Sequence, residues 1–178
     1  MTFFELYGLP VSLILDKSQV SEKFYELSRE CHPDHFTRQS PREQREMLEK
    51  SSMVNNAFKI FQNPDETIKY VLKLKDLLHD DEKYELDPEF LMQVMEISDQ
   101  LMELQADSHE QPLEEIELKA KQLLNQIHND VAPILENYQD DSVTEKELLQ
   151  VKDYYYRKKY LQRILDKIYE IRNIASHI

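Results

Sequence analysis

Four side chains with chemical potential lie close together in the sequence: Cys31, His32, Asp34 and His35. Thiols, imidazoles and carboxylates ligate transition metals or transfer protons, so this segment could hold a metal ion or a catalytic cluster. Pro33 stiffens the segment, however, and no further ligand is near in the sequence. Catalysis also needs a nucleophile, a base and a group that orients the base, and we can assemble no such set. We therefore expect no catalytic residue, no metal ion and no cofactor.

Two amphipathic helices should flank the His32-Pro33-Asp34 segment and hold it in place. The upstream helix has an apolar stripe at helical spacing, made of Val20, Phe24, Leu27 and Cys31. Pro33 disfavours helical geometry at the residue before it, so this helix should end near Cys31. Downstream, Ser40-Pro41-Arg42-Glu43 is typical of a capping box with proline at the first helical position. The second apolar face consists of Met47, Leu48, Val54, Phe58 and Phe61. The sequence therefore predicts a helical hairpin with His32-Pro33-Asp34 at its exposed tip.

Composition indicates an all-α protein. The 178 residues are 40% hydrophobic and include only one glycine and no tryptophan, whereas a β-rich or dinucleotide-binding fold would need more turn glycines. The single cysteine excludes an intramolecular disulfide and any multi-cysteine zinc or iron–sulfur site. No apolar run is long enough for a membrane span, and no signal peptide precedes the first expected helix, so we expect a cytoplasmic protein without membrane partners.

The charge of the chain changes near residue 79. Residues 1–78 have a net charge of about −1, whereas residues 79–178 carry most of the formal total of −13. This asymmetry favours two functional regions and argues against nucleic-acid binding by the second one.

The second region is predicted to be an antiparallel three-helix bundle. Its first helix should start at Asp87-Pro88 and its second at Pro112. Pro133 should kink the second helix. The third helix should start at a capping box, Thr144-Glu145-Lys146-Glu147. Short connections between long helices favour antiparallel packing. We thus expect a first domain over residues 1–78, a linker over 79–87 and the bundle over 88–178.

The helix that begins near Pro88 has more apolar surface than one core needs. Its core wedge should comprise Phe90, Val94, Ile97, Leu101 and Leu104. A second strip, about 100–140° away, contains Leu91, Met95 and Met102, while Met92 lies beside Glu96, Asp99 and Glu103. Methionine suits adaptable contacts, so this strip is typical of a binding surface. The alternative is that Leu91, Met92 and Met95 pack against the first domain or the linker.

The first region resembles the J-domain of DnaJ-type co-chaperones. Four features in the right order carry the resemblance, and they are Phe3-Phe4-Glu5-Leu6-Tyr7-Gly8-Leu9-Pro10, the helix with Phe24 and Leu27, His32-Pro33-Asp34, and Val54-Asn55-Asn56-Ala57-Phe58 followed by Asn63-Pro64. With the acidic bundle that opens on Phe90-Leu91-Met92, nearly the whole chain resembles the HscB/Jac-type co-chaperones of iron–sulfur cluster biogenesis. The four-cysteine extension of some eukaryotic members is absent, which favours a bacterial-type protein.

The resemblance implies that this chain regulates a partner ATPase and is not itself an enzyme. The partner would be a DnaK-class, HscA-type heat-shock chaperone. Asp34 would pair with an arginine of that chaperone, His32 would fix the loop and donate a hydrogen bond, and Pro33 would hold the turn. The other chaperone-binding residues would be Lys23, Arg29, His35 and Arg38. The chain departs from the family here, because acids interleave with Lys23 and Arg29, and His35 stands where lysine is common.

The resemblance also implies that the bundle binds an iron–sulfur cluster scaffold protein. The matching residues are Leu91, Met92, Met95, Glu96, Asp99 and Glu103, with Tyr160 on the last helix. Tyr160 could equally be an ordinary aromatic residue of the bundle. Two rival functions remain open, namely a J-domain co-chaperone with a different client and a helical adaptor that does not stimulate an ATPase.

Overall fold

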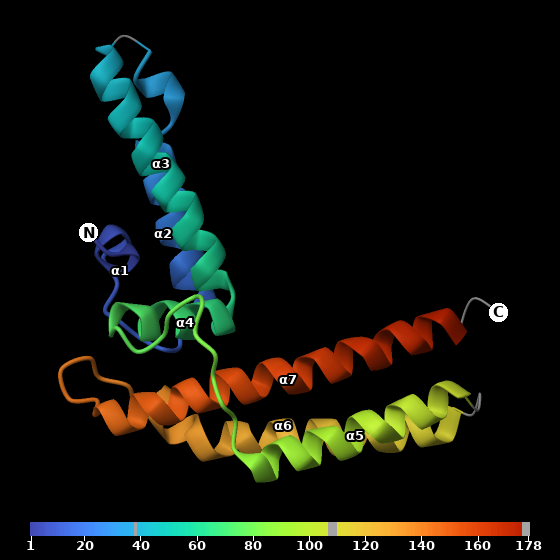
Figure 1. The fold of residues 1–178 in the computed structure, drawn as a ribbon. Coiled ribbons are helices and arrows are strands. Elements are labelled where there is room, and N and C mark those ends of the chain that lie inside the picture. The colour runs from blue at the N-terminus through green and yellow to red at the C-terminus, as the bar shows by residue number, and fades with distance from the viewer. Residues whose placement is uncertain (38, 107–109, 176–178) are drawn as a thin grey trace. The chain divides into compact units, whose positions relative to one another are not determined.

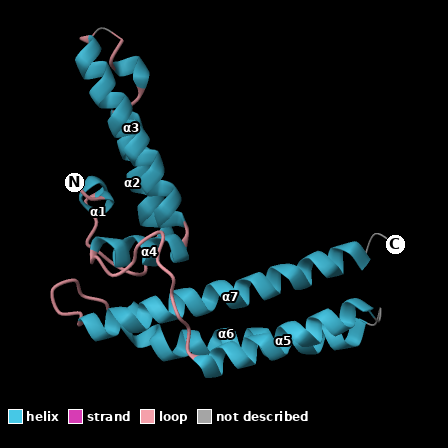
Figure 2. Ribbon diagram, in the orientation of Figure 1, coloured by secondary structure: helices cyan, strands magenta, loops and turns pink. Residues whose placement is uncertain are grey.

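The computed structural model describes residues 1–37, 39–106 and 110–175. All regular secondary structure in these residues is helical, and Figure 2 shows helices and loops only. The α-helices are α1 (Phe3–Tyr7), α2 (Lys17–Glu30), α3 (Pro41–Gln62), α4 (Pro64–Leu74), α5 (Pro88–Ala106), α6 (Glu110–Glu136) and α7 (Glu145–Ala175). A short 3₁₀ turn, η1 (Pro33–His35), stands between α2 and α3. The expectation of an all-α fold is confirmed.

Contacts divide the chain into two compact units. The first unit comprises Met1–Leu78 and Leu135–Thr144, and the second comprises His79–Ile134 and Glu145–Ile178. Figure 1 shows the helices that make up each unit. The loop between α6 and α7 belongs to the first unit, where Asp140 pairs with Lys75 at 2.7 Å and accepts a hydrogen bond from Tyr138 at 2.6 Å.

The first unit is built on the hairpin of α2 and α3, which lie side by side (Figure 1). The rings of Phe24 on α2 and Phe58 on α3 stack with their centroids 4.1 Å apart. About one turn further along α3, helix α1 packs on it, because Phe4 and Tyr7 both contact the buried ring of Phe61. Aromatic contacts of this kind stabilise a small core beyond the area that they bury.

A glycine and an asparagine cap define two further turns of this unit. Gly8 ends α1 with φ 62°, the left-handed conformation that glycine adopts without strain. Asn63 caps the start of α4 by accepting hydrogen bonds from the backbone N–H groups of Asp65 and Glu66.

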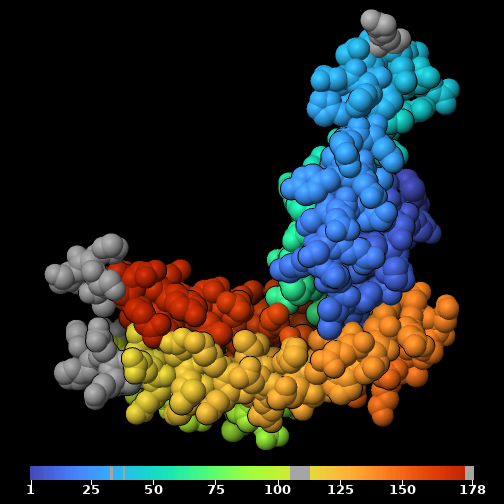
Figure 3. Space-filling view, turned by 180° about the vertical axis from the view of Figure 1, so that it is seen from behind, coloured from blue at the N-terminus to red at the C-terminus, as the bar shows by residue number. Residues whose placement is uncertain are grey.

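The second unit is a bundle of α5, α6 and α7. Glu117 early on α6 pairs with Arg172 late on α7, whereas the ring of His128 further along α6 lies 6.0 Å from that of Tyr154 on α7. These two helices therefore run antiparallel, and Figure 3 shows them side by side in yellow to orange and orange to red. The core residues from α5 are Phe90, Val94, Ile97 and Leu101, which confirms most of the predicted wedge.

Three local expectations need correction. Leu48 does not join the apolar face of α3 but is 67% exposed. The second bundle helix begins at Glu110 and not at Pro112. Its last turn buries Leu135 while Ile134 is only half-buried, so the buried face shifts after Pro133. The two differences in burial arise because the packing partners of a side chain, which the sequence pattern does not contain, decide whether it is covered.

Candidate functional site

His32 and Asp34 at the corner are exposed, as the sequence predicted. The last turn of α2 stops at Glu30, and the Cys31 N–H closes the helix by donating to the carbonyl of Leu27. The Asp34 side chain is 85% exposed, so its carboxylate is available to a partner. The backbone N–H of Asp34 donates to Nδ1 of His32 at 3.4 Å. Within the loop, Nδ1 of His32 thus accepts a hydrogen bond, and the expected donation by this imidazole stays a prediction.

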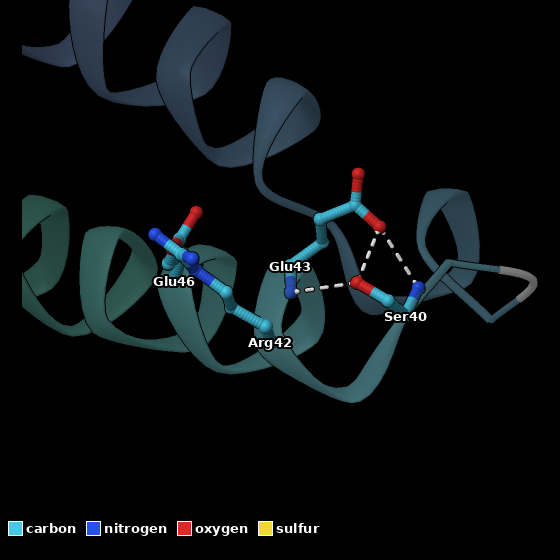
Figure 4. A network of polar contacts seen from close by, with 4 residues as sticks. All are labelled: Ser40, Arg42, Glu43 and Glu46. Carbon is cyan, nitrogen blue, oxygen red and sulfur yellow. Dashed lines mark hydrogen bonds and ion pairs between the residues drawn. The ribbon is translucent and has the colours of Figure 1, made fainter.

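A capping box fixes the position where the chain re-enters a helix (Figure 4). The Ser40 hydroxyl accepts from the Glu43 N–H at 3.3 Å, and the Glu43 carboxylate accepts from the Ser40 N–H at 2.8 Å. The Ser40 hydroxyl also donates to this carboxylate at 2.6 Å, and these hydrogen bonds hold the pKa of Glu43 below its usual range. Arg42 and Glu46 form an ion pair on the outer face of the same turn. The corner is thus anchored at both ends by local hydrogen bonds.

Gln44 ties the rest of the loop to α3. Its side-chain amide donates to the carbonyl oxygens of Phe36 at 3.2 Å and Gln39 at 3.1 Å. Behind this loop is a cavity of about 430 Å³, whose lining residues include Cys31, Phe36, Met47 and the exposed Leu48. Sequence reasoning missed this cavity, because it forms only where the loop folds back on α3.

The geometry does not favour metal or thiol chemistry at the corner. Cys31 is buried, and burial raises the pKa of its thiol, which disfavours the thiolate that binds metals. His32 and His35 are exposed, with ring centroids 6.1 Å apart. Within residues 1–37, 39–106 and 110–175, no three His, Cys, Asp or Glu side chains are grouped closely enough to hold a metal ion.

The other expected chaperone-binding residues lie on or after α2. Lys23 pairs with Glu26 at 2.8 Å, and the hydrogen bond to this acid raises the lysine pKa. Nε of Arg29 donates to the carbonyl of Tyr25 at 3.4 Å. These cations therefore already have partners on their own helix, while Arg38 lies outside the described residues.

The second candidate surface is the methionine-rich strip of α5. Met92, Met95 and Met102 are 70%, 62% and 60% exposed, and Leu91 is half-buried. The acids Glu96, Asp99 and Glu103 are exposed beside them. Met92 and Met95 are thus exposed, whereas Leu91 is partly covered. A continuous apolar strip bordered by carboxylates is left open on this helix.

Three residues of the strip, Leu91, Met95 and Met102, lie on the flank of α5 that adjoins α7, whereas Met92 lies on its outer face. Gln100 points toward α6, because its side chain accepts a hydrogen bond from Lys119. Leu91, Met95 and Met102 lie about 140–180° around the helix from Gln100, beyond the core wedge. In a three-helix bundle that flank adjoins the remaining helix, which is α7.

Tyr160 occupies the facing flank of α7. The guanidinium of Arg157 lies 5.0 Å from the ring centroid of Phe90 on α5, and Tyr160 follows Arg157 by about one turn. Its ring is 38% exposed and lies beneath the guanidinium of Arg163, 5.6 Å from centroid to Cζ. Tyr160 and the strip therefore lie on adjoining flanks of two packed helices. Arg163 was missed by sequence reasoning, although its spacing of three residues from Tyr160 was a signal for such a contact.

Comparison with known proteins adds evidence from both halves of the chain. The family model of the HSCB C-terminal oligomerisation domain matches residues 86–169. The co-chaperone protein HscB homolog of Shewanella halifaxensis is 29% identical over 175 residues, which cover 97% of this chain and 98% of the relative. Over nearly its whole length, the chain is thus similar to HscB co-chaperones.

Further HscB proteins are similar to this chain over a shorter span or in their fold. The HscB homolog of Photobacterium profundum is 37% identical over 105 residues, which are 58% of this chain and 61% of the relative's own length. The crystal structure of human co-chaperone HscB matches with a TM-score of 0.75 at 25% identity, covering 98% of this chain and 83% of the human one. The chaperone HscB of Vibrio cholerae shares the fold, with a TM-score of 0.73 over 98% of this chain and 99% of that one, at 24% identity.

The matched structures span both units of this chain. Within the described residues, the search for long apolar helices found none that could cross a membrane.

Proposed function

We propose that this chain is an HscB-type co-chaperone of iron–sulfur cluster assembly that acts in the cytoplasm of a bacterial-type cell. Its first region, residues 1–78, is a J-domain that stimulates the ATPase of a DnaK-class, HscA-type chaperone. Its bundle, residues 88–178, binds the iron–sulfur scaffold protein and delivers it to that chaperone, and residues 79–87 connect the two. The observation that supports this most directly is the 85% exposed carboxylate of Asp34 in a tightly anchored corner.

Asp34 is proposed to be the residue that the chaperone recognises. Nδ1 of His32 lies 3.6 Å from Oδ2 of this carboxylate, and no lysine or arginine among the described residues forms an ion pair with it. An arginine of the partner can therefore bind this carboxylate without first displacing a lysine or arginine. Removing one member of such a pair costs about 2–5 kcal/mol of binding free energy when the pair is buried in the interface. Pro33, His32 and His35 shape the corner, while Lys23, Arg29 and Arg38 add long-range attraction to an acidic partner.

The strip on α5, together with Tyr160, is proposed to bind the scaffold protein. Leu91, Met92 and Met95 supply adaptable apolar contact, and Glu96, Asp99 and Glu103 select a partner with cationic groups beside an apolar segment. Because one chain carries both surfaces, the bound scaffold reaches a high effective concentration at the chaperone. Delivery of the client and stimulation of the ATPase then occur together.

The first experiment measures single-turnover ATP hydrolysis by the DnaK-class chaperone with and without this protein. Asp34→Asn should abolish stimulation while preserving the helical circular-dichroism spectrum and scaffold binding. Glu49→Gln, which removes one exposed acid from α3, is the matched control and should stimulate normally. Full stimulation by Asp34→Asn would refute the J-domain assignment and favour a helical adaptor.

The second experiment measures scaffold affinity by calorimetry. Replacing Leu91, Met92 and Met95 together by alanine should weaken binding by at least about tenfold, since each loses buried apolar contact in the complex. Leu118→Ala with Leu149→Ala removes two exposed leucines elsewhere on the bundle and should leave the affinity unchanged. If the triple variant binds as tightly as the wild type, the bundle serves a different client.

A further inference from the structure

Residues 82–86, which we call the strap, cross α7 just before α5 begins (Figure 2). Glu82 and Tyr84 are half-buried and Leu86 is buried, whereas Lys83 and Glu85 are exposed. This alternation has the period of two that an extended chain shows when one face is covered. This alternation is visible in the sequence, but it is short, and one of its inward positions is the charged Glu82.

Side chains of α7 bind the inward face of the strap. The Tyr84 hydroxyl donates to Oδ1 of Asp153 at 2.9 Å, and its ring stacks on Tyr156 with centroids 4.4 Å apart and an angle of 7°. Nζ of Lys152 lies 2.6 Å from Oε1 of Glu82. Burial and the hydrogen bond to Asp153 both raise the pKa of the Tyr84 phenol, so it remains a donor at neutral pH. The strap is therefore held by stacking and charge-assisted hydrogen bonds.

The same aspartate connects the strap to α5. Oδ2 of Asp153 lies 2.6 Å from Nε of Arg157, whose guanidinium covers the ring of Phe90. Phe90 is in the first turn of α5, where its N–H donates to the capping carboxylate of Asp87 at 3.0 Å. A continuous series of contacts thus runs from Tyr84 through Asp153 and Arg157 to Phe90.

This series ends beside both parts of the proposed scaffold surface. Leu91 and Met92 follow Phe90 directly, and Tyr160 lies about one turn beyond Arg157. We infer that Tyr84, Asp153 and Arg157 are positioning residues, which fix the first turn of α5 against α7 so that the strip and Tyr160 present one surface to the scaffold protein. The inference rests on the proposed scaffold-binding function. The strap is then a part of the binding module, although it contributes no contact to the partner.

Tyr84→Phe is the sharpest test, because it keeps the stacked ring and removes only the hydroxyl. We expect scaffold affinity to fall about fivefold to tenfold, with amide hydrogen exchange at Phe90 and Leu91 becoming faster in the free protein. Tyr138→Phe is the matched control, since Tyr138 also donates to an aspartate, Asp140, but in the other unit. It should change neither the affinity nor the exchange at these two amides.

A double-mutant cycle separates positioning from general destabilisation. If Tyr84 acts through the strip, the loss caused by Tyr84→Phe should shrink when Met92 is already alanine. Additive losses would mean that the strap does not act through the strip and would overturn the inference. So would a Tyr84→Phe variant whose affinity and amide exchange equal those of Tyr138→Phe.

The result also distinguishes this inference from the proposed function. If the wild type binds the scaffold and the triple alanine variant does not, but Tyr84→Phe binds normally, only the positioning role fails. If the wild type has no affinity for the scaffold protein, the proposed function fails and the inference fails with it.

Discussion

The backbone N–H of Asp34 points at Nδ1 of His32, 3.4 Å away, so the imidazole orients the residue whose carboxylate projects into solvent. Accepting this hydrogen bond needs a lone pair on Nδ1, which the neutral imidazole provides. We propose that His32 orients Asp34 through the backbone, while the carboxylate, 3.6 Å from the same Nδ1, stays exposed to a partner.

This relationship predicts the effect of His32→Ala. Stimulation of the chaperone ATPase should fall by at least about tenfold, because the Asp34 carboxylate must then be ordered at the moment of binding. His32→Asn offers an amide oxygen in place of Nδ1 and should recover part of the stimulation. Steady-state ATPase assays measure both variants, and full activity of His32→Ala would show that the corner needs no such support.

The capping box predicts a local loss of stability. Ser40→Ala should lower the free energy of unfolding by about 1 kcal/mol, because the N–H of Glu43 loses its acceptor. Urea denaturation followed by circular dichroism measures this change. Ser52→Ala, at an exposed position within α3, should be neutral or slightly stabilising. Equal effects of the two substitutions would contradict the role given to the cap.

Tyr7 predicts a loss of stability at alkaline pH. Its buried hydroxyl donates to the carbonyl of Val54 at 2.8 Å, and burial raises its pKa to about 12. In the unfolded chain the Tyr7 phenol ionises at about pH 10. Its contribution to stability is therefore complete below that pH and is lost as the pH rises towards 12. Tyr7→Phe should cost about 1 kcal/mol at neutral pH and have a flatter alkaline profile than the wild type.

Urea denaturation at about pH 8 and about pH 10.5 measures this difference, since the lower value precedes and the higher one enters the expected window. Tyr25→Phe, which changes an exposed tyrosine, should match the wild type at both values. Parallel profiles for Tyr7→Phe and the wild type would show that Tyr7 ionises without disturbing the fold.

The ion pairs of Glu117 lead us to expect a loss of stability at acid pH. Lys121 and Arg172 donate hydrogen bonds to its carboxylate and hold its pKa below the usual range. Its contribution is therefore present above the pKa of an unfolded glutamate and is lost as the pH falls through the lowered value. Glu117→Gln should melt at a lower temperature than the wild type at neutral pH, and the difference should vanish in acid.

Thermal melts across this range check the prediction, with Glu115→Gln as the control that removes an exposed acid of the same helix. A difference between Glu117→Gln and the wild type that persists in acid would mean that packing, and not the ion pairs, is responsible.

Most helix boundaries of this chain could be predicted because they depend on neighbours in the sequence. The hydrogen bonds between Ser40 and Glu43 join residues three apart, and Pro33 acts on the residue immediately before it. Asp87 likewise caps α5 through the N–H of Phe90. Such interactions form whenever the local segment forms, so their residue types are sufficient evidence.

Burial was predicted less well, because it depends on partners that are distant in the sequence. Leu48 fits the apolar spacing of α3, yet no element covers it, and Leu135 is buried where Ile134 was expected. The expected linker includes the strap, and Tyr84 meets Asp153 across 69 positions of the chain. Helical periodicity contains no information about a contact at this separation.

The sequence by itself determined the all-α fold, the turn at His32-Pro33-Asp34 and the excess of apolar residues on α5. Only the tertiary structure decided that Met92 and Met95 stay exposed and that Asp153 joins the strap to α5 through Arg157. The physical reason is the distance along the sequence over which each interaction acts. Backbone geometry and caps act over a few residues, whereas exposure and the assembly of a surface depend on which helices pack together.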